Sequence, residues 1–594
     1  MKDFLKNVLA TFVGILLFFL IFGVLGAMSL VGMIAASDAA TNVKDNSVLV
    51  IDLNGAMTER SESDFKSQLM GGGDTGIGLD DMLCAIEKAK DNKNIKGIYI
   101  EAGMFQSDSP ASTAALRRAL VDFKKSGKWI VAYGDQYTQS NYYICSVADQ
   151  IWLNPIGMVD WHGMAAEPMF LKDLMAKFGV KMQLAKVGTY KSAPEMFTAD
   201  KMSEPNREQV TAYVTGIWNN IVADVSASRK ITPEQLNLLA DKNILFEDPQ
   251  NYLKEKIVDK LIYTDEVKKE VKKLLKLKDD ENINQISVAQ MKTVKQNSNK
   301  GDEIAVYYAY GDIVEKESLN PLTGGGGHSI IGNVVSKDLL KLAEDKDVKA
   351  VVLRVNSGGG SAYASEQIWR AVTLLKEKKP VVVSMGGMAA SGGYYISCAA
   401  NWIVSEPTTL TGSIGIFGMF PDFSNLITQK LGVKFDEVKT NKNSNFGTMS
   451  RPFNEEEMAY LNMYIDRGYE LFRQRVADGR KQPVEAIEKI AQGRVWLGQD
   501  ALKIKLVDEL GDLNAAVKKA AELAKTEKYY TSSYPGKVSW KEQLIGEMSS
   551  SGGNYLDARL REYLGAYYEP FMLMKNINKE SAIQARVPFV LNLK

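Results

Sequence analysis

A serine, a lysine and two glycine-rich turns are the residues of this chain that could together carry out acyl transfer. Ser391 lies in MAASGGYYIS, where small neighbours leave room for a substrate carbonyl to reach the hydroxyl. A serine needs a base to become a nucleophile, and the sequence holds only two histidines, His162 and His328. Neither is excluded from a Ser-His-Asp triad, but neither is well placed for one, because His328 lies in LTGGGGHS and His162 in VDWHG.

A lysine can replace histidine as the base, and Lys191 in VGTYKSAPEMF is the candidate. An amine accepts a proton only when it is neutral, so burial or a like charge must lower its pKa. The glycine, aromatic and proline neighbours of Lys191 give it a mildly apolar setting. Ordinary explanations stay open at this point, since a lysine is commonly a surface residue and a serine before a helix is commonly an N-cap.

Two glycine-rich turns could complete such a site. In RVNSGGGSAYASE a buried strand runs into Gly358, Gly359 and Gly360, and a helix is expected to begin near Ala362. Backbone N–H groups without side chains beside a helix start can bind an anion, so this turn is a candidate oxyanion hole. An ordinary βα turn would carry the same glycines. Ser413, in TGSIGIFG, adds a further hydroxyl, or simply serves its own turn.

The sequence contains the same stretch twice, and the two copies differ in these residues. Three pairs of similar segments, NIKGIYIEAG with DVKAVVLRVN, SNYYICSVAD with GGYYISCAAN, and KFGVK with KLGVK, are separated by 252 or 253 positions. The second copy has Ser391 where the first reads TQSNYY, and the first has Lys191 where the second reads NKNSNFG. A reaction that needs both side chains could be performed by neither copy alone.

Each copy alternates short apolar runs with helical periods, which is typical of βαβ units around a largely parallel sheet. Strands are expected from Ser47 and Glu303, with helices near 79–89 and 336–344. We expect an α/β protein of two tandem repeats, in these parts: residues 1–40 a cytoplasmic N-terminus and membrane anchor, 41–265 the first repeat, 266–302 a charged helix and linker, 303–530 the second repeat, and 531–594 a C-terminal extension with a helix around 555–567.

The N-terminus is predicted to be a transmembrane helix. No charged residue occurs in the 31 positions between Lys6 and Asp38, which as a helix exceeds the hydrocarbon core of about 30 Å. The apolar part of a cleaved signal peptide is about half as long, although the AASDAA tail resembles a cleavage site. Lys2 and Lys6 place the N-terminus in the cytoplasm, and the rest of the chain outside the cytoplasmic membrane.

Composition excludes several other classes of function. Lys and Arg together number 72, as do Asp and Glu, and without a basic stripe we expect no nucleic-acid partner. Three cysteines cannot form a disulfide framework, and Cys145 and Cys398, at nearly equivalent positions of the copies, are expected to be buried packing residues. With two histidines a His-based metal site has few ligands, and we expect no metal and no cofactor.

Five motifs match one family in order and spacing: GTYKSAPEMF, NSGGGSAYASE, SMGGMAASGGYYIS, TGSIGIFG and GRVWLGQDA with LVDELGDL. The chain resembles the signal peptide peptidase family SppA in its long, protease IV type. The resemblance implies tandem ClpP/crotonase-like repeats and peptide-bond hydrolysis by a Ser/Lys dyad. The implied roles are Ser391 as nucleophile, Lys191 as general base, Ser413 as the residue that orients the lysine, and Gly359 and Gly360 as oxyanion N–H donors.

The resemblance also implies a homotetramer at the bacterial inner membrane, with its catalytic repeats on the periplasmic side, acting on hydrophobic peptides such as signal-peptide remnants. One departure is visible, since the family reads NSPGG where this chain has Gly358 in place of proline, which loosens the turn but removes no N–H group. Two alternatives stay open: a crotonase-type acyl-CoA enzyme, which a membrane anchor disfavours, and a non-catalytic membrane scaffold.

Overall fold

The computed structural model describes residues 6, 11–15, 17–18, 21–22, 41–61, 76–294, 301–316, 328–536 and, as backbone, 583–586. Most of the expected membrane helix, and the helix expected around 555–567, lie outside these residues. In the part of the chain that is described, no helix is both long and apolar enough to cross a membrane.

The first repeat is built on a sheet whose described strands all run parallel. The strand order is β2-β1-β3-β4-β5-β7, and β8 also pairs with β1, at the start of that strand. The strands are β1 (Ser47–Thr58), β2 (Ile77–Gly78), β3 (Ile95–Ser107), β4 (Trp129–Tyr137), β5 (Gln150–Val159), β7 (Lys260–Leu261) and β8 (Asn284–Ser287). The helices are α3 (Leu79–Asp91), α4 (Pro110–Lys124), α5 (Gln139–Cys145), α6 (Lys172–Lys177), α7 (Glu195–Thr198), α8 (Glu204–Arg229), α9 (Pro233–Asp241), α10 (Pro249–Lys254), α11 (Thr264–Leu275) and α12 (Val288–Thr293).

The second repeat has a similar sheet in the order β18-β16-β14-β12-β9-β20; β15 also pairs with β14, and β19 pairs with β15. Its described pairs are parallel except β16 with β18. The strands are β9 (Asp302–Tyr310), β12 (Val348–Ser357), β14 (Val381–Ala390), β15 (Trp402–Ser405), β16 (Leu410–Gly412), β18 (Val495–Leu497), β19 (Glu509–Leu510) and β20 (Tyr529–Tyr534). The helices are α13 (Gly332–Glu344), α14 (Ala362–Lys378), α15 (Gly392–Ser397), α16 (Glu455–Arg480), α17 (Val484–Ile490), α18 (Gly498–Lys503) and α19 (Leu513–Ala524).

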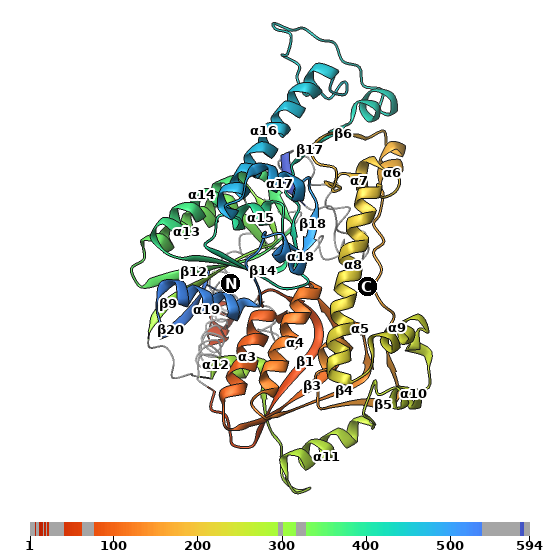
Figure 1. Ribbon diagram of the computed structural model, residues 1–594, viewed down its shortest axis with the longest axis vertical. Helices are drawn as coiled ribbons and strands as arrows, with labels where there is room; N and C mark the ends of the chain where they lie inside the picture. The colour runs from red at the N-terminus through yellow and green to blue at the C-terminus, as the bar shows by residue number, and fades with distance from the viewer. Residues whose placement is uncertain are drawn as a thin grey trace.

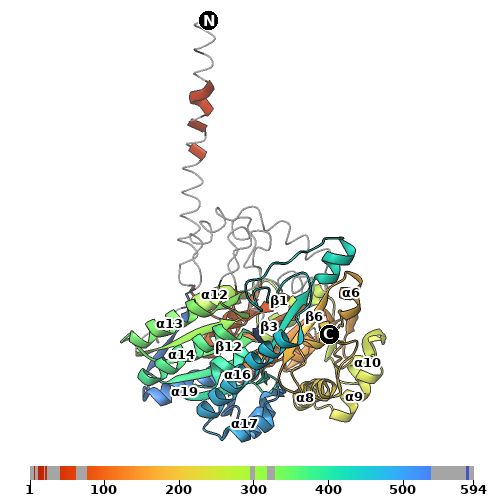
Figure 2. The same ribbon diagram turned by 90° about the horizontal axis from the view of Figure 1, so that it is seen from above.

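The central strand β12 shows why the second sheet is buried on both faces. Val351, Leu353 and Val355 face the core formed with α13 and α14, whereas Ala350 and Val352 face α19. This is the two-residue period of a strand between two helical layers. Burying each Val or Leu side chain contributes about 1.5–3 kcal/mol, so a near-continuous apolar run is what holds the strand in place. In Figure 2, α13, α14 and α19 lie at one end of the body and α8, α9 and α10 at the other.

A third sheet joins the two repeats. Strand β6 (Lys181–Lys186) of the first repeat pairs antiparallel with β17 (Phe417–Asp422) of the second. Helix α8 also spans both repeats (Figure 1), and Val210, Tyr213 and Ile217 on it pack with Ala390 and Leu410 of the second. Segments on both sides of Lys191 in the sequence, β6 before it and α8 after it, therefore contact the second repeat. The other strands of this sheet are β10 (Asp312–Val314), β11 (Ser329–Ile331), β13 (Gly359–Ser361) and β21 (Ile583–Arg586).

Two tandem α/β repeats with largely parallel sheets were predicted, and this part of the fold is confirmed. The segment 266–302 differs from the expected linker. Its first half is helix α11, as predicted, but β8 adds a parallel strand to β1 and α12 packs on α3. Ile286 and Met291 are buried in the first core, so apolar burial draws this segment onto the first repeat. At the other end, β20 extends the second sheet to Tyr534, past the expected boundary at 530.

Candidate active site

Ser391 occupies a tight turn between strand β14 and helix α15. Its backbone has φ 56° and ψ −115°, a region that costs a non-glycine residue about 1–3 kcal/mol. The turn is held by the Ser391 N–H, which donates to the Gly412 carbonyl at 2.8 Å. The side chain is fully buried and makes no capping hydrogen bond to α15. The ordinary N-cap explanation for this serine is therefore wrong, and its hydroxyl is directed elsewhere.

The Lys191 side chain reaches that hydroxyl from the other repeat, within the same chain. The Nζ lies 2.8 Å from the Ser391 Oγ, 3.0 Å from the Ser413 Oγ and 3.1 Å from the Ser413 carbonyl oxygen. Lys191 is fully buried, and burial lowers its pKa well below the usual value. A neutral amine has two N–H groups for Ser413 and one lone pair for the Ser391 O–H, which matches these three contacts.

Ser413 is held as firmly as the lysine it contacts. It follows strand β16 with a positive φ of 50°, and its N–H donates to the Arg494 carbonyl at 2.7 Å. The whole residue is buried. Because both its hydroxyl and its carbonyl oxygen contact Nζ, Ser413 can direct the lysine lone pair toward Ser391.

Gly493, at the start of the GRVWLGQDA motif, shapes the space around Lys191, and no role for it was predicted from the sequence. Its φ is +77°, and a Cβ at this position would lie 2.6 Å from the Lys191 Cβ. The neighbouring Gln492 carbonyl accepts a hydrogen bond from the Tyr190 N–H at 2.8 Å. The turn at Gln492 and Gly493 of the second repeat thus packs directly against the Lys191 segment of the first, and only glycine fits at position 493.

Replacing Gly493 by alanine is expected to lower kcat for peptide hydrolysis about 100-fold, because a displacement near 1 Å at a catalytic group costs that much. Gly127→Ala is the matched control, since Gly127 has the same φ of +77° but no atom within 4 Å of the added Cβ. Steady-state kinetics of the two variants provide the measurement. Equal losses in both would mean that backbone strain, and not displacement of Lys191, is responsible.

The glycine turn lies next to the Ser391 turn, as predicted, but its Gly359 N–H is already engaged. The Gly359 N–H donates to the Ser357 Oγ at 3.1 Å, and Gly360 pairs with Ile313 of β10. A Cβ on Gly393 would lie 2.6 Å from the Ser357 carbonyl oxygen, so the two turns touch. The Gly359 N–H would have to leave Ser357 before it could bind an oxyanion.

A short strand from the C-terminal extension runs beside this turn. Strand β21 pairs antiparallel with β13, Gly359 opposite Arg586 and Gly360 opposite Ala585. On its other side it pairs antiparallel with β17, Phe417 opposite Gln584. The edges of β13 and β17 are therefore spaced to hold an extended peptide between them, as in recognition by strand addition.

The other residues singled out from the sequence make contacts of their own. His162 contacts Asp160 at 2.6 Å and His328 stacks on the Tyr310 ring, whereas the basic group that contacts Ser391 is Lys191. Cys145 and Cys398 are buried, as predicted. Over the described residues, no three or more His, Cys, Asp or Glu side chains converge on a possible metal position.

A comparison with known proteins finds the same family in both repeats. The model of Peptidase family S49 matches residues 122–278 and 373–527, once in each repeat, and that of Clp protease matches residues 322–404. Protease 4 of Salmonella typhi is 37% identical over 85% of this chain and 82% of its own length. Protease 4 of Haemophilus influenzae is 33% identical over 93% and 92%. Serine protease SPPA, chloroplastic, of Arabidopsis thaliana is 30% identical over 81% and 70%.

Proposed function

The chain belongs to peptidase family S49 and is a serine peptidase, and we propose that Ser391 is its nucleophile and Lys191 its general base. The observation that carries this proposal is the 2.8 Å contact between a fully buried lysine amine and a fully buried serine hydroxyl. Family membership disfavours both the acyl-CoA enzyme and the non-catalytic scaffold. A scaffold would also have no use for a neutral amine held against a serine.

In the proposed reaction the Ser391 Oγ attacks the peptide carbonyl carbon while the Lys191 Nζ takes the hydroxyl proton. The tetrahedral intermediate collapses when Nζ returns this proton to the leaving amine, which departs and leaves an ester on Ser391. A water molecule then attacks the ester, Nζ again takes a proton, and the acid product leaves as Ser391 regains its hydrogen. Ser413 holds the amine in place, and N–H groups of the Gly359–Gly360 turn would stabilise the oxyanion once Gly359 is released from Ser357.

The proposed substrates are hydrophobic peptides in extended conformation, such as signal-peptide remnants. The spacing of β13 and β17 around β21 supports an extended substrate, since a peptide in that position would gain backbone hydrogen bonds on both sides. To test this substrate class, the full chain is incubated with synthetic signal peptides and, separately, with charged peptides of equal length that have few apolar residues. The products are mapped by mass spectrometry. Preferential cleavage of the charged peptides would contradict the proposed substrate class.

We further propose that residues 7–37 anchor the protein in the bacterial inner membrane, with both repeats on the periplasmic side. The 31 uncharged positions after Lys6 support this proposal. Protease added to spheroplasts would then degrade the repeats, whereas an inside-out vesicle would protect them. The reverse pattern would overturn the proposed orientation.

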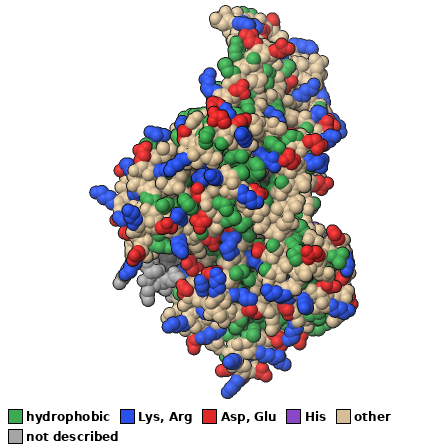
Figure 3. Space-filling model, in the orientation of Figure 1, with side chains coloured by type: hydrophobic (Ala, Val, Ile, Leu, Met, Phe, Trp, Pro, Cys, Tyr) green, Lys and Arg blue, Asp and Glu red, His purple; other side chains and the backbone are tan. Residues whose placement is uncertain are grey.

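A projecting arm formed by α16 and residues 431–453 supports assembly into a homotetramer. The arm stands out from the second repeat in Figure 1, and Figure 3 shows apolar side chains among the charged ones on its surface. Its exposed apolar residues are Leu431, Val433, Phe435, Val438, Phe446, Met449, Tyr460, Met463, Tyr464 and Leu471. Such a concentration of apolar surface is typical of an interaction site.

The double variant Phe435→Glu/Val438→Glu is expected to shift the protein from a tetramer to smaller species, because two charges would be buried without partners. Light scattering coupled to gel filtration gives the mass. Ile156→Glu is the matched control, since Ile156 is 84% exposed on the first repeat, away from the arm. An unchanged mass for the double variant would exclude the arm as the interface.

A further inference from the structure

Strand β14 bulges immediately before the Ser391 turn. Its pairing with β12 is regular from Val351 opposite Val381 to Val355 opposite Met385, and resumes with Ser357 opposite Ala389. Asn356 on β12 therefore stands opposite three residues of β14, Gly386 to Met388. A bulge of this kind breaks the backbone ladder and re-aims the residues that follow it, which here are Ala389, Ala390 and Ser391.

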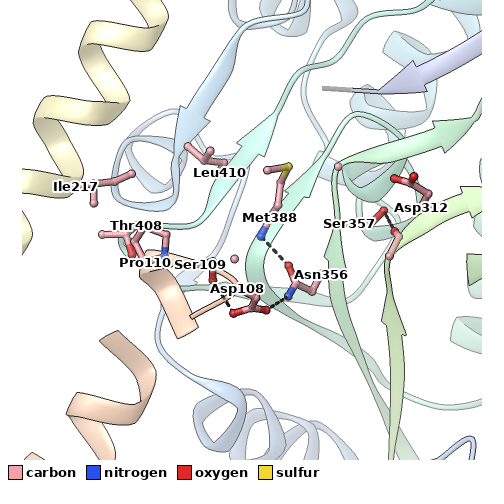
Figure 4. A pocket seen from close by; sticks show the side chains of 13 residues that line it. Asp108, Ser109, Pro110, Ile217, Asp312, Asn356, Ser357, Met388, Thr408 and Leu410 are labelled. Carbon is pink, nitrogen blue, oxygen red and sulfur yellow. Dashed lines mark hydrogen bonds between the residues drawn. The ribbon is translucent and has the colours of Figure 1, made fainter. Parts of the chain in front are cut away.

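The Asn356 side chain replaces the missing ladder bonds and connects the bulge to the first repeat. Its Oδ1 accepts a hydrogen bond from the Met388 N–H at 3.1 Å. Its Nδ2 donates to Asp108 Oδ2 at 3.0 Å and to Glu59 Oε2 at 3.1 Å, both from the first repeat. Figure 4 shows Asn356 between Asp108 and Met388, on the wall of a cavity of about 190 Å³ between the repeats.

The two carboxylates set the orientation of the Asn356 amide. If the amide were rotated by half a turn, its oxygen would face Asp108 and Glu59, and its NH₂ would face the Met388 N–H. Both arrangements are repulsive, so the observed orientation is strongly preferred. Glu59 is itself fixed by Arg354, whose Nε lies 2.6 Å from Glu59 Oε1 in a buried ion pair, which makes this side of the contact rigid.

The glycines of the bulge fit directly against the first repeat. A Cβ on Gly387 would lie 2.3 Å from the Ser109 Oγ, and one on Gly386 would lie 3.2 Å from Glu59 Oε2. Ser109 caps helix α4 as Ser361 caps α14 in the second repeat, and the two serines are 252 positions apart. Asp108 thus holds in the first repeat the position that Gly360 holds in the glycine turn of the second.

We propose that Asn356 is a positioning residue for Ser391, and that Asp108 and Glu59 of the first repeat orient it. The inference rests on the proposed role of Ser391 as nucleophile. The first repeat then contributes to the site twice, with the base and with the carboxylates that hold the bulge. The turn that binds an oxyanion in one copy would serve in the other copy to fix the strand that carries the nucleophile.

Asn356→Ala tests the inference. A shift near 1 Å in Ser391 is expected to lower kcat about 10- to 100-fold, with KM changed less than about twofold, because the edges of β13 and β17 are not altered. Asn401→Ala is the matched control, since the Asn401 Oδ1 accepts the Val381 N–H at 2.8 Å at the far end of the same strand. It removes an equivalent bond at a distance from Ser391 and should keep kcat within about twofold.

Two substitutions of Asp108 separate hydrogen bonding from charge and guard against misfolding of the Asn356 variant. Asp108→Asn keeps an acceptor for the Asn356 Nδ2 and should retain most of kcat, whereas Asp108→Ala should lose severalfold. The rate at which a fluorophosphonate labels Ser391 should fall in parallel with kcat. Equal kcat losses in Asn356→Ala and Asn401→Ala, or wild-type labelling of Asn356→Ala, would overturn the positioning role. Full activity of Ser391→Ala would instead overturn the proposed function itself.

Discussion

Ser391→Ala and Lys191→Met are each expected to lower kcat/KM for peptide hydrolysis by about 10⁴- to 10⁶-fold, as loss of one member of a catalytic unit does. The first change removes the attacking oxygen, and the second removes the group 2.8 Å away that takes its proton. Initial rates with a fluorogenic peptide measure both losses. Ser365→Ala and Lys186→Met are the controls, since they change a buried serine and a nearby lysine that do not contact Ser391. Substantial activity in either active-site variant would contradict the proposed Ser/Lys dyad.

The same two variants test whether each site is complete within one chain. Lys191 and Ser391 meet in the described structure without a second copy. Mixed assemblies of the two inactive variants should therefore stay inactive. If the mixture recovered about a quarter or more of the rate of the same amount of wild-type protein, the base would have to come from a neighbouring chain.

The pH profile of kcat/KM is the second prediction with a large effect. Burial lowers the pKa of Lys191 well below its usual value, and only the neutral amine can take the Ser391 proton. Below that pKa the rate should therefore rise about tenfold per pH unit, and it should level off well before the pH at which an exposed lysine titrates, about 10.4. An inflection near pH 10.4 would show that Lys191 is not the buried base.

Stability measured over the same range provides an independent check. Between the lowered folded-state pKa of Lys191 and about 10.4, the unfolded chain binds a proton that the folded chain does not. The contribution of Lys191 to the free energy of unfolding should therefore rise with pH in that window. Lys191→Met should lack this part of the slope in chemical denaturation series, whereas Lys186→Met should keep it.

Local sequence pattern was sufficient for the elements that carry the site. The apolar run of β12 predicted a buried strand, because hydrophobic periodicity is read directly from neighbouring positions. That Ser391 and Lys191 act together was implied by the family resemblance, not by local pattern.

Contacts between distant segments could not be predicted in this way. The pairing of β6 with β17 carries Lys191 to Ser391, yet the two strands are more than 200 positions apart and neither has a distinctive pattern. The bonds of Glu59 and Asp108 to Asn356 depend on how the repeats dock. The role of Gly493 could not be predicted either, because its need for a bare Cα arises from the Lys191 backbone, 302 positions away.

The most direct test of the central claim is covalent labelling of the full chain with a fluorophosphonate, followed by peptide mapping. The proposed mechanism predicts one modified residue, Ser391, with a labelling rate that falls at least about 10³-fold in Lys191→Met. Modification of another serine, or labelling of Ser391 at the same rate without Lys191, would contradict an active site assembled from both repeats.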